Sequence, residues 1–547
     1  MTPGGRWSAL LLVAAAALLP SLQVLEGDFV ADDFGCLRLW GQKPLSAFLA
    51  FGDISEGIWG IPIDEPRPVD ALSFRLGFLT SGAEAWGHLL LALAIHVGCS
   101  LLVFGVARAA APEAPLLAAV AGAALFAVHP VHAEAIAWVT GKVDSLATLF
   151  YLAALGLYLR WRVAGGALRY AAALVAFMAG LLTKEVLLTL PALIVAAEAL
   201  LVPDASLGAR LRHAARRLSA AAPFVLVALL YLVGRRLAFG SFAREQRLGY
   251  ESLGLLADRQ IFNLGSMLLP ATGLEAGVLA AAIVVGVALL LLEGTRVRRV
   301  LAPLGLFAIV FYVATTAPLL LTYVSSRHLY LPSAGVAVAA GLGLFPSTRA
   351  WGARVAVLLA AMAVLTPGLR REQRQWIDAG DASRTLGASI ERMTRDLPPT
   401  ATVLLAGIPA TDGDVLVWRA ALPFALEPPF LARSVPGSLR LLESPDLYCC
   451  PFAQWWRARG PTVRGLLEGA PGEEVTLWLL EWRGEGRRLA RRDAVLTRAA
   501  IRERLEQAGV DPYAGPEGPR EGSRLLGALA RAVRASAVRG AGVGETR

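Results

Sequence analysis

Long apolar runs separated by short polar segments fill the first two thirds of the sequence. Eleven such runs occur, from "RWSALLLVAAAALLPSLQVL" at the start to "ARVAVLLAAMAVL" before residue 370. A run of about 18 or more apolar residues is long enough to cross the hydrocarbon core of a bilayer. The pattern therefore predicts an all-α polytopic membrane protein with about 11 transmembrane helices.

One further apolar segment differs from the others because its centre is polar. In "LGLLADRQIFNLGSMLLP" the middle positions are Asp258, Arg259 and Gln260. Ionisable groups are costly at mid-bilayer, so we expect an interfacial or re-entrant helix there rather than a span.

Composition agrees with a membrane protein. The 547 residues are 56% hydrophobic and 17% charged, and the mean hydropathy is +0.56. A single soluble core does not grow this large, so the excess apolar surface requires a bilayer. The net charge of +9 comes largely from arginines in short loops between apolar runs, which is how topology is encoded, so we expect no nucleic-acid partner.

The arginine-rich loops predict the orientation. They carry Arg160, Arg162 and Arg169; Arg210, Arg212, Arg216 and Arg217; and Arg296, Arg298 and Arg299. Basic loops stay in the cytoplasm, so the N-terminus is predicted inside. With eleven spans, the long loop 26–83 and everything after residue 370 then lie outside.

The last third of the chain has the pattern of a soluble domain. "TATVLLAGIP" and "EEVTLWLLEW" read as short strands, and "AVLTRAAIRERLEQA" reads as an amphipathic helix. We expect a transmembrane domain over 1–370, a small extracytoplasmic α/β domain over 375–512, and a basic, flexible tail over 513–547.

Polar clusters recur at the predicted outer ends of the spans. They contain the pair Asp32 and Asp33; His129, His132 and Glu134 with Lys142 and Asp144; the pair Lys184 and Glu185; and Arg327, His328 and Tyr330. Each cluster alone can be a hydrated loop, and Lys184 and Glu185 can simply pair with one another. An ionised group costs about 2.5–3.5 kcal/mol at mid-bilayer, so four clusters on one side indicate one wet, charged cavity.

The chemistry of this cavity has two interpretations. The residues His129, His132 and Glu134 are of metal-ligand type, but their spacing matches no specific metal motif. A divalent metal is compatible with the sequence, and no cofactor is required by it. Carboxylates opposed by cations suit group transfer from an anionic donor, because a carboxylate can accept the acceptor's proton while cations stabilise the departing phosphate.

The motifs in this order resemble a known family. The segments "ADDF", "RPVDALSFRLGF" with "WGHLLLALAIHVGCSLLVF", "HPVHAEAIAWVTGKVDSLATLFYLAAL", "LLTKEVLLTLPALI" and "SSRHLYLPSAG" are similar to segments of the GT-C integral membrane glycosyltransferases that use polyprenyl-phosphate sugars. The resemblance is to bacterial relatives of the cadherin-targeting transmembrane O-mannosyltransferases, and it covers roughly residues 1–370. Many relatives carry tetratricopeptide repeats after the last span, whereas this chain has the short α/β-like domain there.

The resemblance implies a fold, a reaction and residue roles. It implies a GT-C fold in which Asp32 is the catalytic base, Asp33 is its neighbour, and Arg327 binds the lipid-linked phosphate. The other polar residues would lie around the donor. The implied partners are a polyprenyl-phosphate-linked sugar, with mannose as the candidate, a protein or glycan acceptor, and the bilayer of a bacterial inner membrane. The alternatives are a transporter or flippase of lipid-linked saccharide and a non-catalytic envelope-assembly protein.

Overall fold

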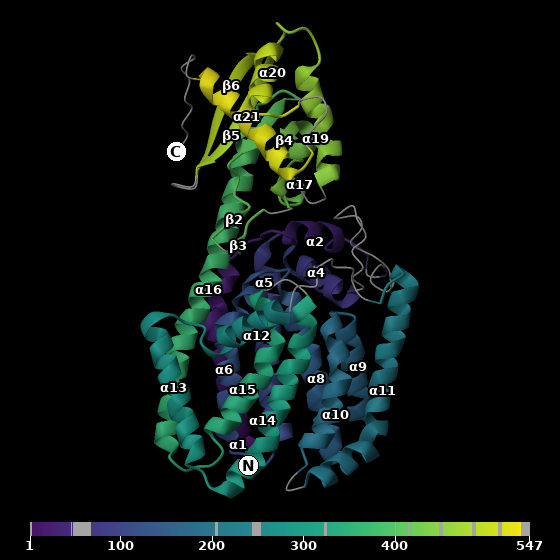
Figure 1. Cartoon of the computed structure of the whole chain (residues 1–547), viewed down its shortest axis with the longest axis vertical. Coiled ribbons are helices and arrows are strands. Elements are labelled where there is room, and N and C mark those ends of the chain that lie inside the picture. Colours follow the sequence, from purple (N-terminus) through teal and green to yellow (C-terminus); the bar gives the residue numbers. More distant parts are fainter. Residues whose placement is uncertain are drawn as a thin grey trace.

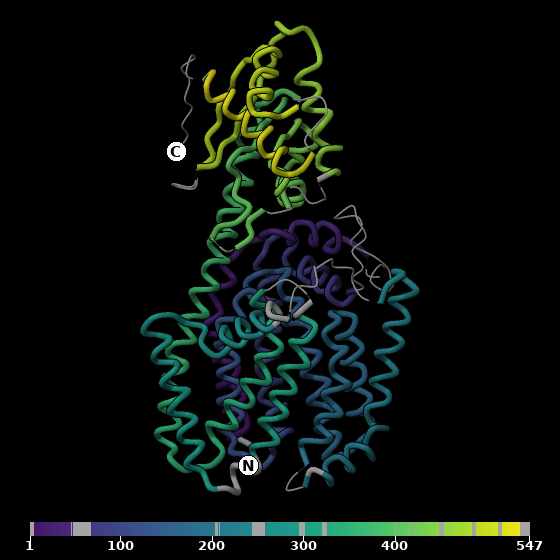
Figure 2. The backbone as a smooth tube through the Cα atoms, in the orientation of Figure 1, coloured from purple at the N-terminus to yellow at the C-terminus, as the bar shows by residue number. Residues whose placement is uncertain are grey.

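The protein consists of a bundle of membrane helices with a smaller mixed domain beyond one end of it (Figure 1). The computed structural model describes residues 3–44, 46, 67–202, 206–242, 253–321, 325–399, 401–413, 415–418, 421–447, 452–483, 488–511 and 517–537. The N-terminus lies at the end of the bundle opposite to the C-terminal domain (Figures 1 and 2).

Long helices build the bundle. They are α1 (Pro3–Leu18, continued by the 3-10 helix η1, Leu19–Glu26), α5 (Ala85–Ala110), α6 (Leu116–Ala127), α8 (Lys142–Ala164), α9 (Ala167–Leu181), α10 (Leu190–Leu200), α11 (Leu207–Phe239), α13 (Gly273–Leu291), α14 (Thr295–Thr316, continued by η5, Ala317–Leu321), α15 (Tyr330–Leu344) and α16 (Trp351–Met393). Helix α12 (Leu253–Leu268) lies near the end of the bundle that faces the C-terminal domain (Figure 1).

The structure supports a polytopic membrane protein and gives fewer long spans than the sequence pattern predicts. Among the described residues, seven helices are long and apolar enough to cross a membrane, or eight if the bent pair of α6 with residues 130–137 counts as one span. Helices α9, α10 and α15 are shorter than a full span, with 15, 11 and 15 residues. Counting them as crossings would give the expected eleven.

Short 3-10 turns adjoin the short helices at the end where the polar clusters lie. They are η3 (Pro130–His132), which leads into α7 (Ala133–Ala137), η4 (Glu185–Thr189) before α10, and η6 (Ser326–Leu329) before α15. The chain bends by 56° between α6 and the η3–α7 segment. Helices that stop short leave space for polar backbone and side chains at this end, where water can reach them.

The loop predicted over residues 26–83 contains two helices in its described parts. They are α2 (Asp33–Trp40) and α4 (Pro68–Ser81). Both lie across the end of the bundle beneath the C-terminal domain (Figure 1). The backbone N–H of Val69 donates to the carbonyl of Leu182 at 3.1 Å, which fixes α4 to the connection after α9.

A mixed sheet forms the C-terminal domain. Its elements are β1 (Thr402–Ala406), β2 (Thr411–Asp412), β3 (Val415–Leu416), α17 (Leu422–Ala425), α18 (Val435–Ser438), β4 (Arg440–Leu442), η7 (Pro445–Leu447), α19 (Phe452–Leu467), β5 (Glu474–Arg483), β6 (Arg488–Thr497), α20 (Arg498–Gln507) and α21 (Pro519–Ala537). The sheet order is β4-β1-β5-β6, with β1 parallel to β4 and β5, and β6 antiparallel to β5. Strands β2 and β3 form a separate antiparallel pair.

The two faces of the sheet pack against different partners. Successive side chains of a strand point to opposite faces. Leu404 therefore packs with α19, α20 and α21 in one cluster, whereas Val403 and Leu405 belong to a second cluster that includes Phe29 and Phe34 from the first loop. The C-terminal domain and the first loop thus share a core.

Three expectations for the last third need correction. Residues 494–497 of the predicted helix belong to β6, because their backbone pairs with β5, and the helix begins at Arg498. Residues 519–537 of the predicted flexible tail form α21, whose apolar side packs against β6 and β1. Helix α16 also runs without interruption through the expected boundary near residue 370.

Candidate functional site

The acidic pair after the first span lies in a tight turn with two different environments. Asp33 is fully buried, and its carboxylate accepts hydrogen bonds from the Val30 N–H at 3.0 Å, the Thr140 N–H at 2.7 Å and the Thr140 hydroxyl at 2.6 Å. Burial raises the pKa of Asp33 to about 7, and the hydrogen bonds from Thr140 and Val30 oppose this shift. Asp32, one residue earlier, is only half-buried.

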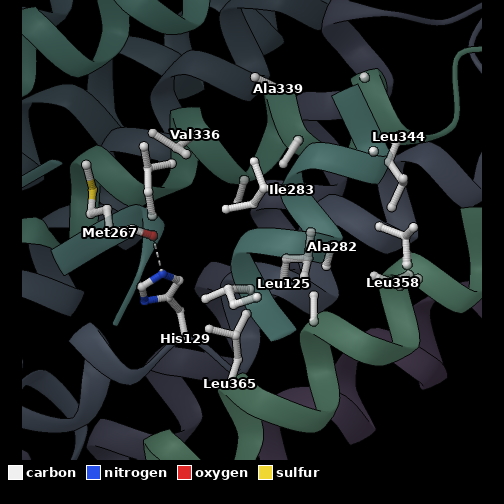
Figure 3. A pocket seen from close by; sticks show the side chains of 18 of the residues that line it. Leu125, His129, Met267, Ala282, Ile283, Val336, Ala339, Leu344, Leu358 and Leu365 are labelled. Atoms are coloured by element: carbon white, nitrogen blue, oxygen red, sulfur yellow. Dashed lines mark hydrogen bonds between the residues drawn. The ribbon is translucent and has the colours of Figure 1, made fainter. Parts of the chain in front are cut away.

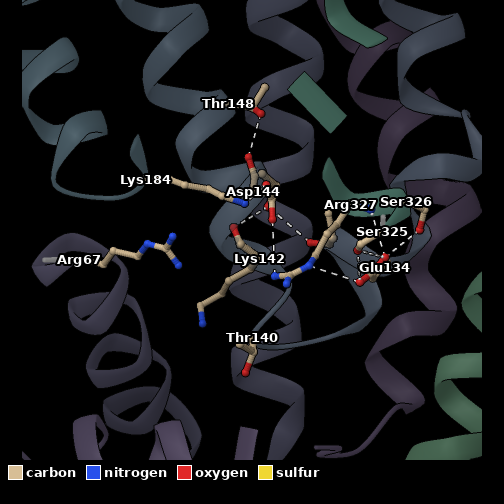
Figure 4. A network of polar contacts seen from close by, with 12 residues as sticks. Arg67, Glu134, Thr140, Lys142, Asp144, Thr148, Lys184, Ser325, Ser326 and Arg327 are labelled. Atoms are coloured by element: carbon tan, nitrogen blue, oxygen red, sulfur yellow. Dashed lines mark hydrogen bonds and ion pairs between the residues drawn. The ribbon is translucent and has the colours of Figure 1, made fainter. Parts of the chain in front are cut away.

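Thr140 ties the acidic turn to the segment just before α8, and Asp144 in the first turn of α8 belongs to a network of ionised side chains. Asp144 forms an ion pair with Lys184, and its other carboxylate oxygen lies 3.6 Å from Nη1 of Arg327 (Figure 4). Nε of Arg327 lies 3.3 Å from Glu134. Four residues from three separate segments of the sequence therefore meet at one end of the bundle, as the sequence pattern predicts.

Glu134 is the most extensively bonded carboxylate of this network. It accepts hydrogen bonds from the hydroxyls of Ser325 and Ser326 at 2.7 and 2.8 Å, and from the backbone N–H of Arg327 at 3.1 Å (Figure 4). These contacts connect α7 to η6, so the Glu134 side chain helps to fix the backbone that carries Arg327.

A second group of ion pairs adjoins the first. Glu185, next to Lys184, pairs with Arg67 at 2.9 Å and with Arg235 at 3.6 Å. Together with the pairs around Asp144, these contacts join four cations, on Lys184, Arg327, Arg67 and Arg235, to three carboxylates. The excess of positive charge suits an anionic ligand.

An aromatic wall borders the network. The guanidinium of Arg327 lies 4.8 Å from the ring centre of Trp138, and Trp138 stacks on Trp376 of α16 with centroids 5.4 Å apart. The indole N–H of Trp138 is buried and has no hydrogen-bond partner among the described residues. The stack holds Arg327 in place through a cation–π contact.

Lys142 has a different environment from Lys184. Its ammonium donates to the carbonyl of Val139 at 3.0 Å and lies 3.3 Å from the ring centre of Phe74 in α4. It is fully buried and points away from Asp144 (Figure 4). These contacts hold α4 against the start of α8, and they do not bring Lys142 into the Asp144 network.

His129, His132 and Glu134 each contact a different partner in the structure. His129 contacts the carbonyl of Met267 at 2.8 Å, His132 contacts the hydroxyl of Ser333 at 2.9 Å, and Glu134 is turned to the serines. Among the residues that the structure describes, no group of three His, Cys, Asp or Glu side chains could hold a metal ion.

Tyr330 and His328 are both buried. The Tyr330 hydroxyl lies 2.6 Å from Nδ1 of His96, and its ring packs on His132 with centroids 4.3 Å apart. Tyr330 therefore belongs to an aromatic cluster behind the network and fixes the start of α15. Of the predicted residues, Glu134, Lys184, Glu185 and Arg327 share the ion-pair groups, whereas Lys142, His129, His132 and Tyr330 support them from outside.

An apolar cavity of about 350 Å³ lies between α6, α13, α15 and α16 (Figure 3). His129 stands at its border, with its ring turned to Met267 (Figure 3). The cavity runs along α15 from Ser333 to Leu344, where the small residues Ala337, Ala340 and Gly343 line it. At about 1.5 Å per residue this stretch is about 16 Å long, roughly half the hydrocarbon core.

Several contacts of the site were not predicted from the sequence. Arg67 pairs with Glu185, Trp138 contacts Arg327, and Thr140 binds Asp33. Trp138 and Thr140 stand between Glu134 and Lys142 in the sequence, so their position among predicted site residues is a signal that could have found them. Arg67 is the first residue of "RPVDALSFRLGF", a segment that shares the family resemblance, so its position there is a comparable signal.

Sequence comparisons give relatives of stated activity for part of the chain. The chain is 36% identical over 202 residues to the protein O-mannosyl-transferase Tmtc2 of Drosophila melanogaster, a match covering 33% of this chain and 20% of that protein. It is 34% identical over 167 residues to the protein O-mannosyl-transferase TMTC4 of Homo sapiens, covering 26% and 22%. No family model matches the chain.

Two solved structures have a similar backbone. ArnT from Cupriavidus metallidurans in the apo state matches over 88% of this chain and 94% of its own, at 15% identity and a TM-score of 0.49. An oligosaccharyltransferase from Archaeoglobus fulgidus, tethered to an acceptor peptide, matches over 74% and 62%, at 17% identity and a TM-score of 0.41. Both TM-scores are below 0.5, so the function proposed below does not rest on them.

The sequence relatives are matched over about a fifth of their own length, so their activity is not transferred to this chain by the match alone. The resemblance expected from the motifs is nevertheless confirmed: this chain is similar in sequence to the transmembrane protein O-mannosyl-transferases.

Proposed function

We propose that the protein is a GT-C glycosyltransferase that moves a sugar from a polyprenyl-phosphate carrier to an acceptor hydroxyl, on the side of the membrane where the C-terminal domain lies. The observation that carries this proposal is the network of Glu134, Asp144, Lys184 and Arg327, on the same segments of the bundle to which the Asp32 turn is tied through Asp33 and Thr140. The names of the sequence relatives favour mannose as the sugar and a protein as the acceptor.

Asp32 is the proposed general base. The acceptor oxygen bonds to the anomeric carbon while the bond from this carbon to the phosphate oxygen breaks, and Asp32 takes the acceptor's proton. Asp33 supports this role, because its saturated hydrogen bonds fix the turn to α8. With the carboxylate of Asp33 occupied in this way, Asp32 is the better placed of the two to reach an acceptor.

Arg327 and Lys184 are the proposed phosphate ligands. As the sugar leaves, the carrier phosphate gains negative charge, and preorganised cations stabilise that charge without reorganising. Asp144 and Glu134 hold both cations in position before the donor binds. A guanidinium can also grip a phosphate through two parallel hydrogen bonds.

The apolar cavity along α15 is the proposed seat of the carrier's isoprenoid chain. It is lined almost entirely by apolar side chains and begins beside His129, five residues before Glu134. A lipid tail in this cavity would place its phosphate at the end of the bundle where the cations lie.

The substitution Asp32→Asn tests the proposal. The purified protein in nanodiscs would receive polyprenyl-phosphate-mannose and a pool of peptides containing Ser and Thr, and release of polyprenyl phosphate would be measured. Loss of the base should lower turnover by about 10²–10⁴-fold. Asp396→Asn, the same substitution at an exposed aspartate that pairs with Arg491, is the control and should retain turnover within about threefold. Equal activity of Asp32→Asn and wild type would exclude Asp32 as the base.

A further inference from the structure

The residue before Asp32 has an unusual backbone conformation. Ala31 has φ of +47° and is fully buried. A non-glycine residue in this left-handed region is strained, and such strain persists only where surrounding contacts impose it. The contacts that impose it here determine where the Asp32 carboxylate stands.

One of these contacts comes from the C-terminal domain. The Ala31 N–H donates to the backbone carbonyl of Val417 at 2.7 Å. Val417 follows β3, nearly 400 positions later in the chain, and is itself fully buried. On the other side, Asp33 is tied to Thr140. The turn is therefore held between the membrane bundle and the C-terminal domain.

Aromatic packing reinforces this backbone contact. Phe430 of the C-terminal domain packs edge-on against Phe34 and Phe29 of the turn, with ring centroids 4.7 and 5.7 Å away. Arg38 of α2 pairs with Glu427. Edge-to-face aromatic pairs add directional preference to the burial of apolar area, so they favour one orientation of the turn.

The segment that makes these contacts is anchored to α16. The indole N–H of Trp418, next to Val417, donates to the hydroxyl of Ser383 at 2.7 Å. On the same helix, a Cβ at Gly380 would stand only 2.6 Å from the backbone nitrogen of Asp28. The close approach of α16 to the first loop therefore requires glycine there, and it leaves the turn little freedom to shift.

We propose that Val417, Glu427 and Phe430 of the C-terminal domain position the Asp32 turn, and that this domain is consequently part of the active site. The proposal rests on the function proposed above for its chemistry. A general base must stand within hydrogen-bond reach of the acceptor, and a misplacement of about 1 Å can cost about 10²-fold in rate. Phe430 and Val417 are positioning residues in this arrangement, because they act through the turn.

The test compares two truncations in the same domain. Phe430→Ala removes the packing on the turn, whereas Leu526→Ala removes a buried side chain of α21 on the opposite face of the sheet. Phe430→Ala should lower kcat by about 10- to 100-fold with the KM for the lipid-linked sugar within about twofold of wild type. Leu526→Ala and the conservative Phe430→Leu should retain most of the turnover.

Hydrogen exchange of the backbone amides at residues 28–36 gives a second readout that needs no activity. These amides should exchange faster than wild type in Phe430→Ala, and their exchange rates should be unchanged in Leu526→Ala. Normal turnover and normal protection in Phe430→Ala would overturn the proposal, as would equal losses in both alanine variants. If the wild-type protein transferred no sugar, the proposed function would fail, and the exchange data would still decide whether the domain holds the turn.

Discussion

At the scale of single residues, the two neighbouring aspartates of the acidic turn differ in burial and in hydrogen bonding. Asp33 satisfies three donors that the fold has buried, whereas Asp32 is half-buried at the surface of the turn. Of these adjacent carboxylates, Asp33 fixes the backbone of the turn, and Asp32 is the one that we propose as the base.

This division predicts a stability defect for Asp33→Asn that Asp32→Asn should lack. An amide in place of the carboxylate turns an NH₂ group toward an N–H donor, which should cost about 1–3 kcal/mol. The pKa of Asp33 is raised to about 7, so the stability it contributes is fully present below about pH 4 and is lost as the pH rises through 7. The deficit of Asp33→Asn, measured as thermal unfolding in detergent, should therefore be largest at pH 5 and shrink toward pH 8. A deficit that grows with pH would contradict this assignment.

A second residue-scale prediction concerns Arg327. Arg327→Lys keeps the charge but loses the planar fork and the stack on Trp138. The KM for the lipid-linked sugar should rise about tenfold, which corresponds to about 1.4 kcal/mol, and Arg327→Ala should raise it further. Arg371→Lys, an exposed arginine of α16 paired with Glu275, is the matched control and should behave as wild type. If the kinetics of Arg327→Ala were unchanged, the phosphate site would have to be assigned to Arg67 and Arg235 instead.

At the scale of helices and strands, α15 combines two properties. Its first turn carries the polar residues that follow Arg327, and its later turns present small side chains to the apolar cavity. Because these side chains are small, they leave space in which a lipid chain can lie against the helix. The same helix thus connects the charged end of the site to the membrane interior.

Filling the cavity should weaken donor binding in a way that depends on chain length. Ala340→Phe would occupy space along α15, and exclusion of two methylenes costs about 1.6 kcal/mol, or roughly tenfold in affinity. The KM should rise for a long-chain donor and change little for a short-chain one. Leu306→Phe, on an exposed position of α14, is the control. An equal effect on both donors would argue against a lipid tail in this cavity.

Local patterns in the sequence were sufficient for the helices and for the charged cluster, and insufficient for contacts between distant segments. The spacing of Glu134, Asp144, Lys184 and Arg327 at span ends predicted their convergence, because ionised groups avoid the bilayer. The pairing of β5 with residues 494–497 overrode their place in an apparent helix. The bond from Ala31 to Val417 joins segments with no shared pattern, so no periodicity could have indicated it.

At the scale of the whole molecule, the acidic turn, the ion-pair network and the C-terminal domain all lie toward one end of the bundle (Figure 1). The start of α11 and the start of α14, both arginine-rich in sequence, lie at the opposite end of the bundle (Figure 1). This separation agrees with the topology predicted from the basic loops, in which the C-terminal domain is extracytoplasmic.

Thiol labelling of intact cells tests this topology. In a background with Cys449→Ser and Cys450→Ser, Gly472→Cys lies in open space on the C-terminal domain, and Ala167→Cys lies at the exposed start of α9. A membrane-impermeant reagent should label Gly472→Cys in intact cells and Ala167→Cys only after lysis. The reverse labelling pattern would show that the protein has the opposite orientation in the membrane.

Helix α16 makes the site sensitive to the membrane itself. Its 43 residues correspond to about 64 Å, about twice the hydrocarbon thickness, and the same helix carries Trp376 beside the network and Ser383 beneath the C-terminal domain. A helix adjusts its tilt when bilayer thickness changes. A change in tilt would move Trp376 together with Ser383, whose bond to Trp418 anchors the segment that contacts the acidic turn. Turnover should therefore pass through an optimum as the acyl chains of the surrounding lipids are lengthened.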